Sequence, residues 1–202
     1  QEPKSTQVSG IGLLAVFKTG KETKVGFGSS SNTITPQGIA EAFDKAKRNK
    51  LYDPDFYSLP EPVGKSVLEN YHDPAVMEIR DEAIVDLGWR GLKGAITEYN
   101  QKQFNKSIII GGDITIRKER MAIASTKGMN DWDESTVLTA NITSMIEMEK
   151  VKGTGWNTST HISCFSPEEA GRESAESAIR TRGGDRISSG TYDVIFGKQP
   201  VT

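Results

Sequence analysis

The stretch "SGIGLLAVFKTGKETKVGFGSSS", residues 9–31, decides how the rest of the chain is interpreted. Residues 10–15 match the G-x-G-x-x-A fingerprint of dinucleotide-binding folds, which needs a strand before the glycines and a helix after them. Here the glycines are followed by a β-type run over 13–17, a turn over 18–22 and an alternating segment over 24–28. The pattern therefore predicts a strand–turn–strand hairpin, with no helix N-terminus to hold a pyrophosphate.

Composition limits the classes of function that the chain can have. It has 202 residues, 35% of them hydrophobic and 26% charged, with a formal net charge of −2. This length suits one domain or two small ones, and the charge gives no basic field for nucleic acid. No apolar run approaches the length of a membrane span, and no signal peptide opens the sequence. A single cysteine, Cys164, agrees with a reducing compartment. We therefore expect a cytoplasmic protein without nucleic-acid or membrane partners.

The first half of the chain combines the hairpin with helices. Thr35 and Pro36 form an N-cap and first-turn pair, so a helix is predicted over 36–48, with Ile39, Phe43 and Ala46 on one face. The segment 51–64 contains three prolines and is predicted to be an ordered excursion or linker. Apolar spacing predicts a helical stretch within 75–103, although three glycines inside it weaken its continuity. They are Gly88, Gly91 and Gly94.

The second half is predicted to be mostly sheet. A hairpin over 107–126 would turn at the charged residues 117–119, and 135–150 forms the clearest strand. Its apolar face comprises Leu138, Ala140, Ile142, Ile146 and Met148. Further segments follow: an alternating strand over 156–164, a helix over 167–182 capped by Ser166, and a last strand over 190–197. The fold class is α+β, a mostly antiparallel sheet with helices packed on one side. The hairpin 11–28 is expected to share its sheet with 137–149.

Three segments organise this fold. Residues 1–62 form a hairpin–helix segment, 63–106 a helical connection, and 107–202 an antiparallel sheet with a helix. Together they are expected to make one N-terminal domain of a longer protein.

No residue pattern indicates a catalytic, cofactor-binding or metal-binding site. Zinc needs three or four ligands, whereas the chain offers His72, His161 and Cys164. In an alternating strand His161 and Cys164 would point to opposite faces, so we interpret them as a surface or cleft histidine and a small buried thiol. The acidic cluster of "NDWDES", Asp131, Asp133 and Glu134, is predicted to be a solvated loop. Its Trp132 is either an interface anchor or tucked back onto the sheet.

Four motifs occur in order along the chain. The first is 9–50, where glycine-flanked strands precede a Thr-Pro-started, alanine-rich helix, and the second is "IASTKGM", a small-residue strand ending in a glycine turn. The third is "VKGTGWNTST", and the fourth is "SPEEAGRESAESAIRTRGGDRISSGTYDVIFGKQPV". Over about residues 8–202 the chain resembles the N-terminal part of the TldD/PmbA family, proteins often labelled modulators of DNA gyrase.

This resemblance implies a function for the longer protein. Active members look like zinc metallopeptidases whose His-Glu-x-x-x-His motif lies in a C-terminal half, which would begin after "GKQPVT". Metal-bearing subunits pair with PmbA (TldE) subunits that lack the ligands, and the dimer takes unfolded peptides into a cavity. "GKQPV" looks more like the PmbA kind. The resemblance thus implies a non-catalytic domain without a cofactor of its own, in a homo- or heterodimer.

Two hypotheses follow from the residues and the resemblance. In the first, the domain shapes the dimer and the peptide cavity of the metallopeptidase assembly. The region 136–160 would border that cavity, or the subunit interface, through Thr139, Asn141, Thr143, Gly153, Gly155 and Trp156, because small polar residues suit a wet wall and glycines allow close backbone approach. An ordinary strand with a solvated back face explains the same residues. In the second hypothesis, the protein is an interaction or regulatory protein of the gyrase-modulator type, with no peptidase role.

Overall fold

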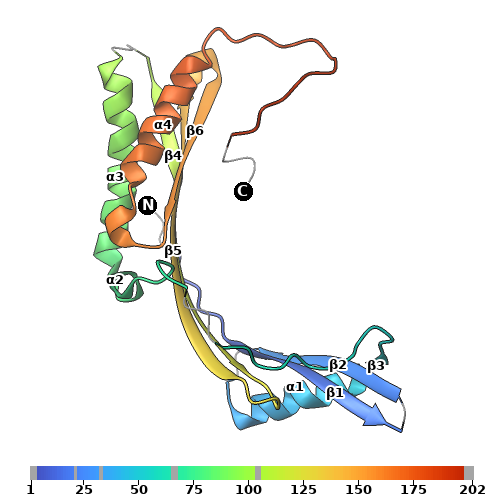
Figure 1. Ribbon diagram of the computed structural model, residues 1–202. Helices are drawn as coiled ribbons and strands as arrows, with labels where there is room; N and C mark the ends of the chain where they lie inside the picture. The colour runs from blue at the N-terminus through green and yellow to red at the C-terminus, as the bar shows by residue number, and fades with distance from the viewer. Residues whose placement is uncertain (1–3, 21, 32–33, 65–67, 103–105, 198–202) are drawn as a thin grey trace. The chain divides into compact units, whose positions relative to one another are not determined.

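The structure is a computed structural model that describes residues 4–20, 22–31, 34–64, 68–102 and 106–197 (Figure 1). The chain divides into two compact units, which we call unit 1 (residues 1–61) and unit 2 (residues 62–202). Each unit has its own antiparallel three-stranded sheet with helices against it. The α+β fold class is thus confirmed. The expectation that hairpin 11–28 pairs with strand 137–149 is wrong, because the two segments belong to separate sheets.

Unit 1 is a hairpin covered by one helix. Strands β1 (Gly10–Thr19) and β2 (Glu22–Ser31) pair along their whole length, and the two-residue β3 (Leu51–Tyr52) joins the other edge of β2. Gly20 takes the left-handed conformation that the tight turn requires, with φ of 64°. The hairpin prediction is confirmed, and the residues that match the dinucleotide fingerprint lie inside a strand.

Helix α1 (Pro36–Arg48) begins where the sequence predicts, with the Thr35 hydroxyl accepting the Gly38 N–H at 3.3 Å. Its buried face, however, consists of Gly38, Ala42 and Ala46, whereas Ile39 and Phe43 stay about half exposed. The predicted face is therefore wrong except at Ala46. The cause is the close approach of α1 to β2, where a Cβ on Gly28 would lie 1.9 Å from the Ala42 carbonyl oxygen. Only small residues fit such a contact.

Unit 2 contains the longer sheet, in the order β4 (Ile108–Ala124), β5 (Asn130–Ile146) and β6 (Val151–Ser159). β4 runs unbroken through 117–119, so the predicted turn is wrong there. The chain turns instead at 125–129, where the Ser125 N–H donates to the Met129 carbonyl at 2.8 Å. Consequently the acidic stretch 130–134 is strand and not the predicted loop. Residues 190–197 form no strand in the structure, contrary to the prediction.

Helices α3 (Asp81–Gln101) and α4 (Pro167–Arg180) cover one face of this sheet, and the short α2 (Pro74–Met77) precedes α3 (Figure 1). α3 is continuous despite its glycines, and two of them, Gly91 and Gly94, lie where α4 approaches its backbone. A Cβ on Gly94 would lie 2.3 Å from the Glu168 carbonyl oxygen. The Arg90 guanidinium also pairs with the Glu168 carboxylate across this contact. None of the helices in the described ranges combines the length and apolarity needed to cross a membrane.

Beneath α3 and α4 lies the hydrophobic core of unit 2. Its large fully buried side chains include Leu138, Ile146 and Val76. Alternation along β5 places the even-numbered residues 136–146 in this core, as the sequence predicts for Leu138, Ala140, Ile142 and Ile146. Met148 is the exception, since the strand ends at Ile146 and Met148 is exposed in the turn Glu147–Glu149 (η1).

Candidate functional site

The face of sheet β4–β5–β6 that lies away from the helices carries part of the predicted site. On β5, Thr139 is half-buried and Asn141 and Thr143 are exposed, while their even-numbered neighbours are buried under the helices. Trp156 on β6 is paired with Asn141, so its side chain belongs to the same side of the sheet. We call the surface of Thr139, Asn141, Thr143 and Trp156 the open face of unit 2.

Hydrogen-bonding groups populate this open face. Asn141 Nδ2 lies 3.5 Å from a carboxylate oxygen of Asp113 on β4, and the hydroxyls of Thr139 and Thr158 lie 3.4 Å apart. Gly111, opposite Thr143, would point a Cβ into open space. Apart from Trp156, the surface is therefore polar and built from small side chains. It can offer hydrogen bonds to a polar ligand or to the main chain of a peptide.

The two predicted glycines lie on the opposite face of the sheet. Gly153 and Gly155 pair with Ser144 and Ile142, which are both buried. A Cβ on Gly155 would lie 1.9 Å from the Ala170 carbonyl oxygen, and one on Gly153 would lie 2.1 Å from the Ala178 backbone nitrogen. The structure therefore separates the six predicted residues. Close backbone approach does occur at the glycines, and the backbone that approaches is that of α4.

The outer edge of β6 is partly capped by side chains. The Trp156 N–H points away from β5 and donates to a carboxylate oxygen of Glu173 on α4 at 3.2 Å. Further along the edge, the Thr181 hydroxyl lies 3.5 Å from the Lys152 carbonyl oxygen. A peptide that added to this edge as a new strand would have to displace both contacts.

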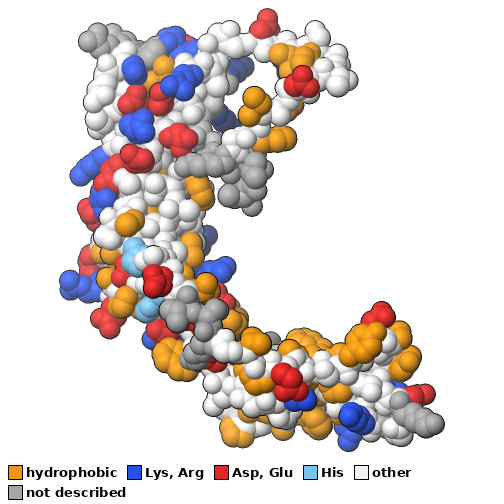
Figure 2. Space-filling model, in the orientation of Figure 1, with side chains coloured by type: hydrophobic (Ala, Val, Ile, Leu, Met, Phe, Trp, Pro, Cys, Tyr) orange, Lys and Arg blue, Asp and Glu red, His pale blue; other side chains and the backbone are white. Residues whose placement is uncertain are grey.

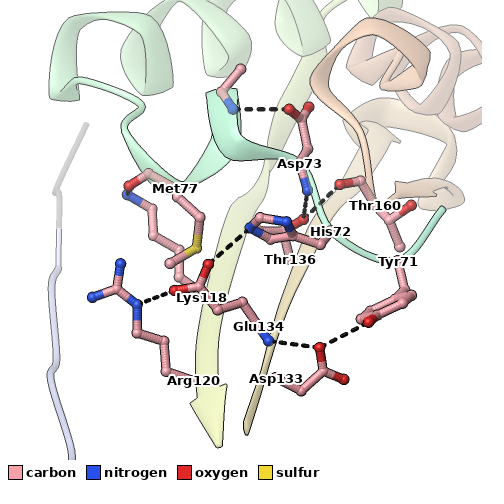
Figure 3. Close-up of polar contacts among 11 residues, drawn as sticks. Tyr71, His72, Asp73, Met77, Lys118, Arg120, Asp133, Glu134, Thr136 and Thr160 are labelled. Carbon is pink, nitrogen blue, oxygen red and sulfur yellow. Dashed lines mark hydrogen bonds and ion pairs between the residues drawn. The ribbon is translucent and has the colours of Figure 1, made fainter. Parts of the chain in front are cut away.

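A polar cluster that the sequence did not reveal lies at one end of the α2 segment (Figure 3). The Thr136 N–H donates to the Tyr71 carbonyl at 3.1 Å, and the Thr136 hydroxyl accepts the Asp73 N–H at 2.9 Å. The Thr136 hydroxyl in turn donates to the Thr160 carbonyl at 2.8 Å. These bonds fix the segment before α2 onto β5, although its residues are far apart in sequence.

Asp73 is the buried acid of this cluster. Its carboxylate accepts the Ile162 N–H at 2.8 Å and the Ala75 N–H at 2.9 Å. The Ile162 N–H is the main cause that holds the pKa of Asp73 below its ordinary value, against the opposing effect of burial. Asp73 is thus a structural anchor and the N-cap of α2. The Asp73-Pro74 pair is a sequence signal for this cap, but nothing local indicates the bond to Ile162.

Both histidines lie beside this cluster. His72 Nε2 is 3.4 Å from a Glu134 carboxylate oxygen, and Glu134 also pairs with Arg120 at 2.5 Å (Figure 3). His161 Nδ1 lies 3.0 Å from the Thr160 hydroxyl. The strand prediction is wrong at His161 and Cys164, because β6 ends at Ser159 and a 3-10 turn (Ile162–Cys164, η2) follows. Cys164 is exposed, so the expectation of a buried thiol is also wrong.

Metal-ligating side chains are scattered over the structure. No group of three or more His, Cys, Asp or Glu residues is placed to hold a metal ion in the part of the chain that the structure describes. Asp131 and Asp133 lie on one face of β5 and Glu134 lies on the other. Asp133 accepts a hydrogen bond of 2.8 Å from the Tyr71 hydroxyl. Trp132, between them, has 70% of its surface exposed, so it does not tuck back onto the sheet.

The fold matches solved structures of gyrase-modulator-like proteins. One, from Bacteroides thetaiotaomicron, is described as a candidate modulator of DNA gyrase. It matches with a TM-score of 0.64 and 13% identity over 92% of this chain and 46% of its own. Another, from Thermotoga maritima, carries the same description and matches with a TM-score of 0.60 and 17% identity over 91% of this chain and 44% of its own. No family model and no curated protein matches the sequence.

These matches confirm, at the level of the fold, the resemblance found in the sequence. The chain has the architecture of these gyrase-modulator-like structures along nearly all of its length. It spans less than half of the length of either matched structure.

Proposed function

We propose that the chain is a non-catalytic part of a TldD/PmbA-type protein. In this role it contributes to dimerisation and to the peptide-binding cavity of a zinc metallopeptidase assembly that acts on unfolded peptides. The observation that carries the proposal is the open face of unit 2, a polar surface of small side chains beside Trp156, on a sheet whose other face is covered by α3 and α4. Such a surface can contact many peptide sequences through water and main-chain hydrogen bonds.

The residues that the structure describes do not fit a zinc site. His161 and Cys164 sit at the two ends of one short turn, and the buried His72 Nε2 lies 3.4 Å from a Glu134 carboxylate oxygen. Zinc in proteins takes three or four ligands around one point, and the described residues provide no such group. We therefore assign no step of peptide cleavage to this chain. In the proposed assembly it would bind and orient peptide.

Peptide binding can be tested with the full chain and a permanently unfolded polypeptide, fluorescently labelled reduced and carboxymethylated α-lactalbumin. Thr143→Lys places a bulky charge on the open face, and it should weaken binding by about tenfold, as measured by fluorescence anisotropy. Thr97→Lys, at an exposed position on α3, is the matched control and should change binding by less than about twofold. A wild-type chain that binds no unfolded polypeptide contradicts the proposal, as does equal binding by the two variants.

The alternative is an interaction protein that modulates DNA gyrase, favoured by the description that both matched structures carry. It predicts that the full chain, at micromolar concentration, changes the rate at which gyrase supercoils relaxed plasmid. A chain that alters supercoiling and binds no unfolded polypeptide would favour the alternative over peptide binding.

A further inference from the structure

Strand β1 is an unprotected edge of the unit 1 sheet. Within the described residues it has a strand neighbour on one side only, β2. From Gly10 to Phe17 it contains no charged residue and no proline. Edge strands are templates for pairing with another chain, and natural proteins usually blunt them with charges, proline, bulges or a covering segment. The β6 edge shows such protection, since Glu173 and Thr181 contact its backbone and Lys152 lies on it.

The face of the unit 1 sheet that lies away from α1 is apolar. Leu14 and Phe27 are paired across β1 and β2, with 50% and 60% of their surfaces exposed, and Leu51 on β3 is 74% exposed. Val16 and Val25, a directly opposite pair, complete the surface, which we call the apolar face of unit 1. Figure 2 shows hydrophobic side chains gathered over these strands. The corresponding face of unit 2 is polar, so the same architecture carries opposite chemistry.

The size of the apolar face indicates what can cover it. Two ten-residue strands about 33 Å long, with a short third strand, span a surface of about 400 Å². A stable dimer needs about 800 Å² from each partner, so the face is about half of what a second copy would require. It does match the length of one extended segment of about ten residues. The uncharged edge of β1 adjoins the face and offers backbone donors and acceptors to such a segment.

We infer that β1 binds an extended, apolar segment of another polypeptide, which adds to the unit 1 sheet as a further strand. Main-chain hydrogen bonds to β1 hold the segment whatever its sequence, and its alternate side chains extend the apolar face beside Leu14. The segments selected are therefore about eight to ten residues long, uncharged and rich in β-branched or aromatic residues. This inference rests on the proposed function, peptide binding, and adds to the open face of unit 2 a second binding surface, the β1 edge of unit 1, with the class of peptide that it selects.

Two substitutions at equally exposed positions distinguish binding at this surface from non-specific hydrophobic binding. Leu14 on the apolar face and Ile39 on α1 are each 50% exposed, so lysine is tolerated at both positions without loss of the fold. The probe is a fluorescent peptide of about ten residues that alternates threonine and valine, with lysines at its ends. Leu14→Lys should weaken its binding by about tenfold, and Ile39→Lys should leave it within about twofold of wild type. Circular dichroism spectra verify that both variants are folded.

A second probe tests strand addition itself. The same peptide with its central backbone nitrogens methylated keeps the side chains and loses the N–H donors, so it should bind at least about tenfold more weakly. Equal binding of the methylated and unmethylated peptides would overturn the inference. So would a dimer of the wild-type chain in sedimentation experiments that Leu14→Lys dissociates, because a second copy would then occupy the face.

These outcomes also separate the inference from the proposed function. If the chain binds carboxymethylated α-lactalbumin in a manner sensitive to Thr143→Lys but does not bind the threonine–valine peptide, the proposed function stands and the role of β1 is refuted. If the chain binds neither probe, peptide binding itself fails and the inference fails with it.

Discussion

In unit 1 and in unit 2, a helix packs on a hairpin through the same kind of close contact between a strand glycine and the helix backbone. In each unit a glycine of the second hairpin strand lies against the first half of a helix that begins at proline. A Cβ on Gly28 would lie 1.9 Å from the Ala42 carbonyl oxygen, and one on Gly155 would lie 1.9 Å from the Ala170 carbonyl oxygen. Both contacts bring backbone onto backbone, which gains dispersion energy but buries little hydrophobic side-chain surface.

The units differ in what they add to this contact. Unit 2 places α3 on the free flank of α4 and buries Leu138, Ile142 and Ile146 beneath the helices. In unit 1 the buried residues among those described are glycines, Ala42, Ala46 and Ser30, and nothing larger. Because hydrophobic stabilisation scales with buried apolar area, unit 1 has the smaller margin of stability. The comparison teaches that unit 1 leaves its large apolar side chains exposed, where another molecule can contact them.

The largest expected effect comes from adding a Cβ to the glycine that contacts the helix in each unit. Gly155→Ala forces α4 away from β6, since its Cβ meets backbone rather than a flexible side chain. We expect a loss of about 3 kcal/mol or more in the free energy of unfolding, measured by urea titration. Gly28→Ala creates the same clash but should release α1 alone, seen as lost hydrogen-exchange protection over 36–48.

A control for this prediction lies on the open face. Gly111 has nothing within 4 Å of its Cβ position, so Gly111→Ala should change stability by less than about 1 kcal/mol. If the amides of α1 keep their full hydrogen-exchange protection in Gly28→Ala, then unit 1 does not have the close glycine–helix contact that unit 2 has, and the comparison fails.

The next effect concerns the two leucines. Leu138 is fully buried in unit 2 and Leu14 is half exposed in unit 1. Leu138→Ala leaves a cavity and should cost about 3 kcal/mol in thermal or urea unfolding, whereas Leu14→Ala should cost less than about 1 kcal/mol. Comparable losses for both leucines would mean that the apolar face of unit 1 is already buried in the isolated protein.

A smaller effect is expected at the buried hydroxyl pair between β5 and α4. The Ser174 hydroxyl donates to the Gly171 carbonyl at 2.7 Å and lies 2.8 Å from the Ser144 hydroxyl, so Ser144 donates to Ser174. Ser174→Ala leaves the Ser144 hydroxyl buried without its acceptor and should cost about 1–2 kcal/mol. The double variant with Ser144→Ala should recover about half of that loss or more, because no buried hydroxyl then lacks a partner. A double variant that is additively worse would show that the pair contributes by packing alone.

Local signals account for the elements that the sequence predicted correctly. Thr35 and Pro36 define the start of α1, Gly20 makes the tight turn of the first hairpin, and alternation along β5 separates core from solvent. These features depend on neighbouring residues and need no knowledge of the rest of the fold.

The errors arose where distant pairing decides the structure. Residues 117–119 resemble a turn, but β4 is an edge strand that exposes their charges while β5 pairs with them throughout. A related reason explains why the residues of the predicted site lie on two opposite faces of the sheet. The pairing of Gly155 with Ile142 rather than with an odd-numbered residue of β5 places the glycines under α4. A shift of one residue would reverse the face, and sequence alone does not fix that register.

The smallest expected effect is a pH dependence at the end of α4, where the units again differ. Lys45 ties α1 to β2 by donating to the Ser29 carbonyl at 2.8 Å, a contact without a carboxylate. In unit 2 the Glu149 carboxylate pairs with Arg182, at 2.8 Å for one of its contacts, and with Lys106. Arg182 first and Lys106 second lower the pKa of Glu149 to about 2. The pairing of Glu149 with Arg182 and Lys106 should therefore weaken in acid.

The sign of the effect follows from the lowered pKa. Glu149 loses a proton more readily in the folded than in the unfolded chain, so its contribution is present above about pH 4.5 and is lost as the pH falls toward about 2. Glu149→Gln should lower the melting temperature slightly at neutral pH, by an amount that shrinks as the pH falls below about 4.5 and vanishes only below about pH 2. Glu119→Gln, in the exposed pair with Arg117, is the matched control and should shift the melting temperature less at neutral pH. If Glu149→Gln lowers the melting temperature equally at neutral and acid pH, then Glu149 acts by packing and not by its charge. The charged contact of Glu149 would then not be what distinguishes unit 2 from unit 1.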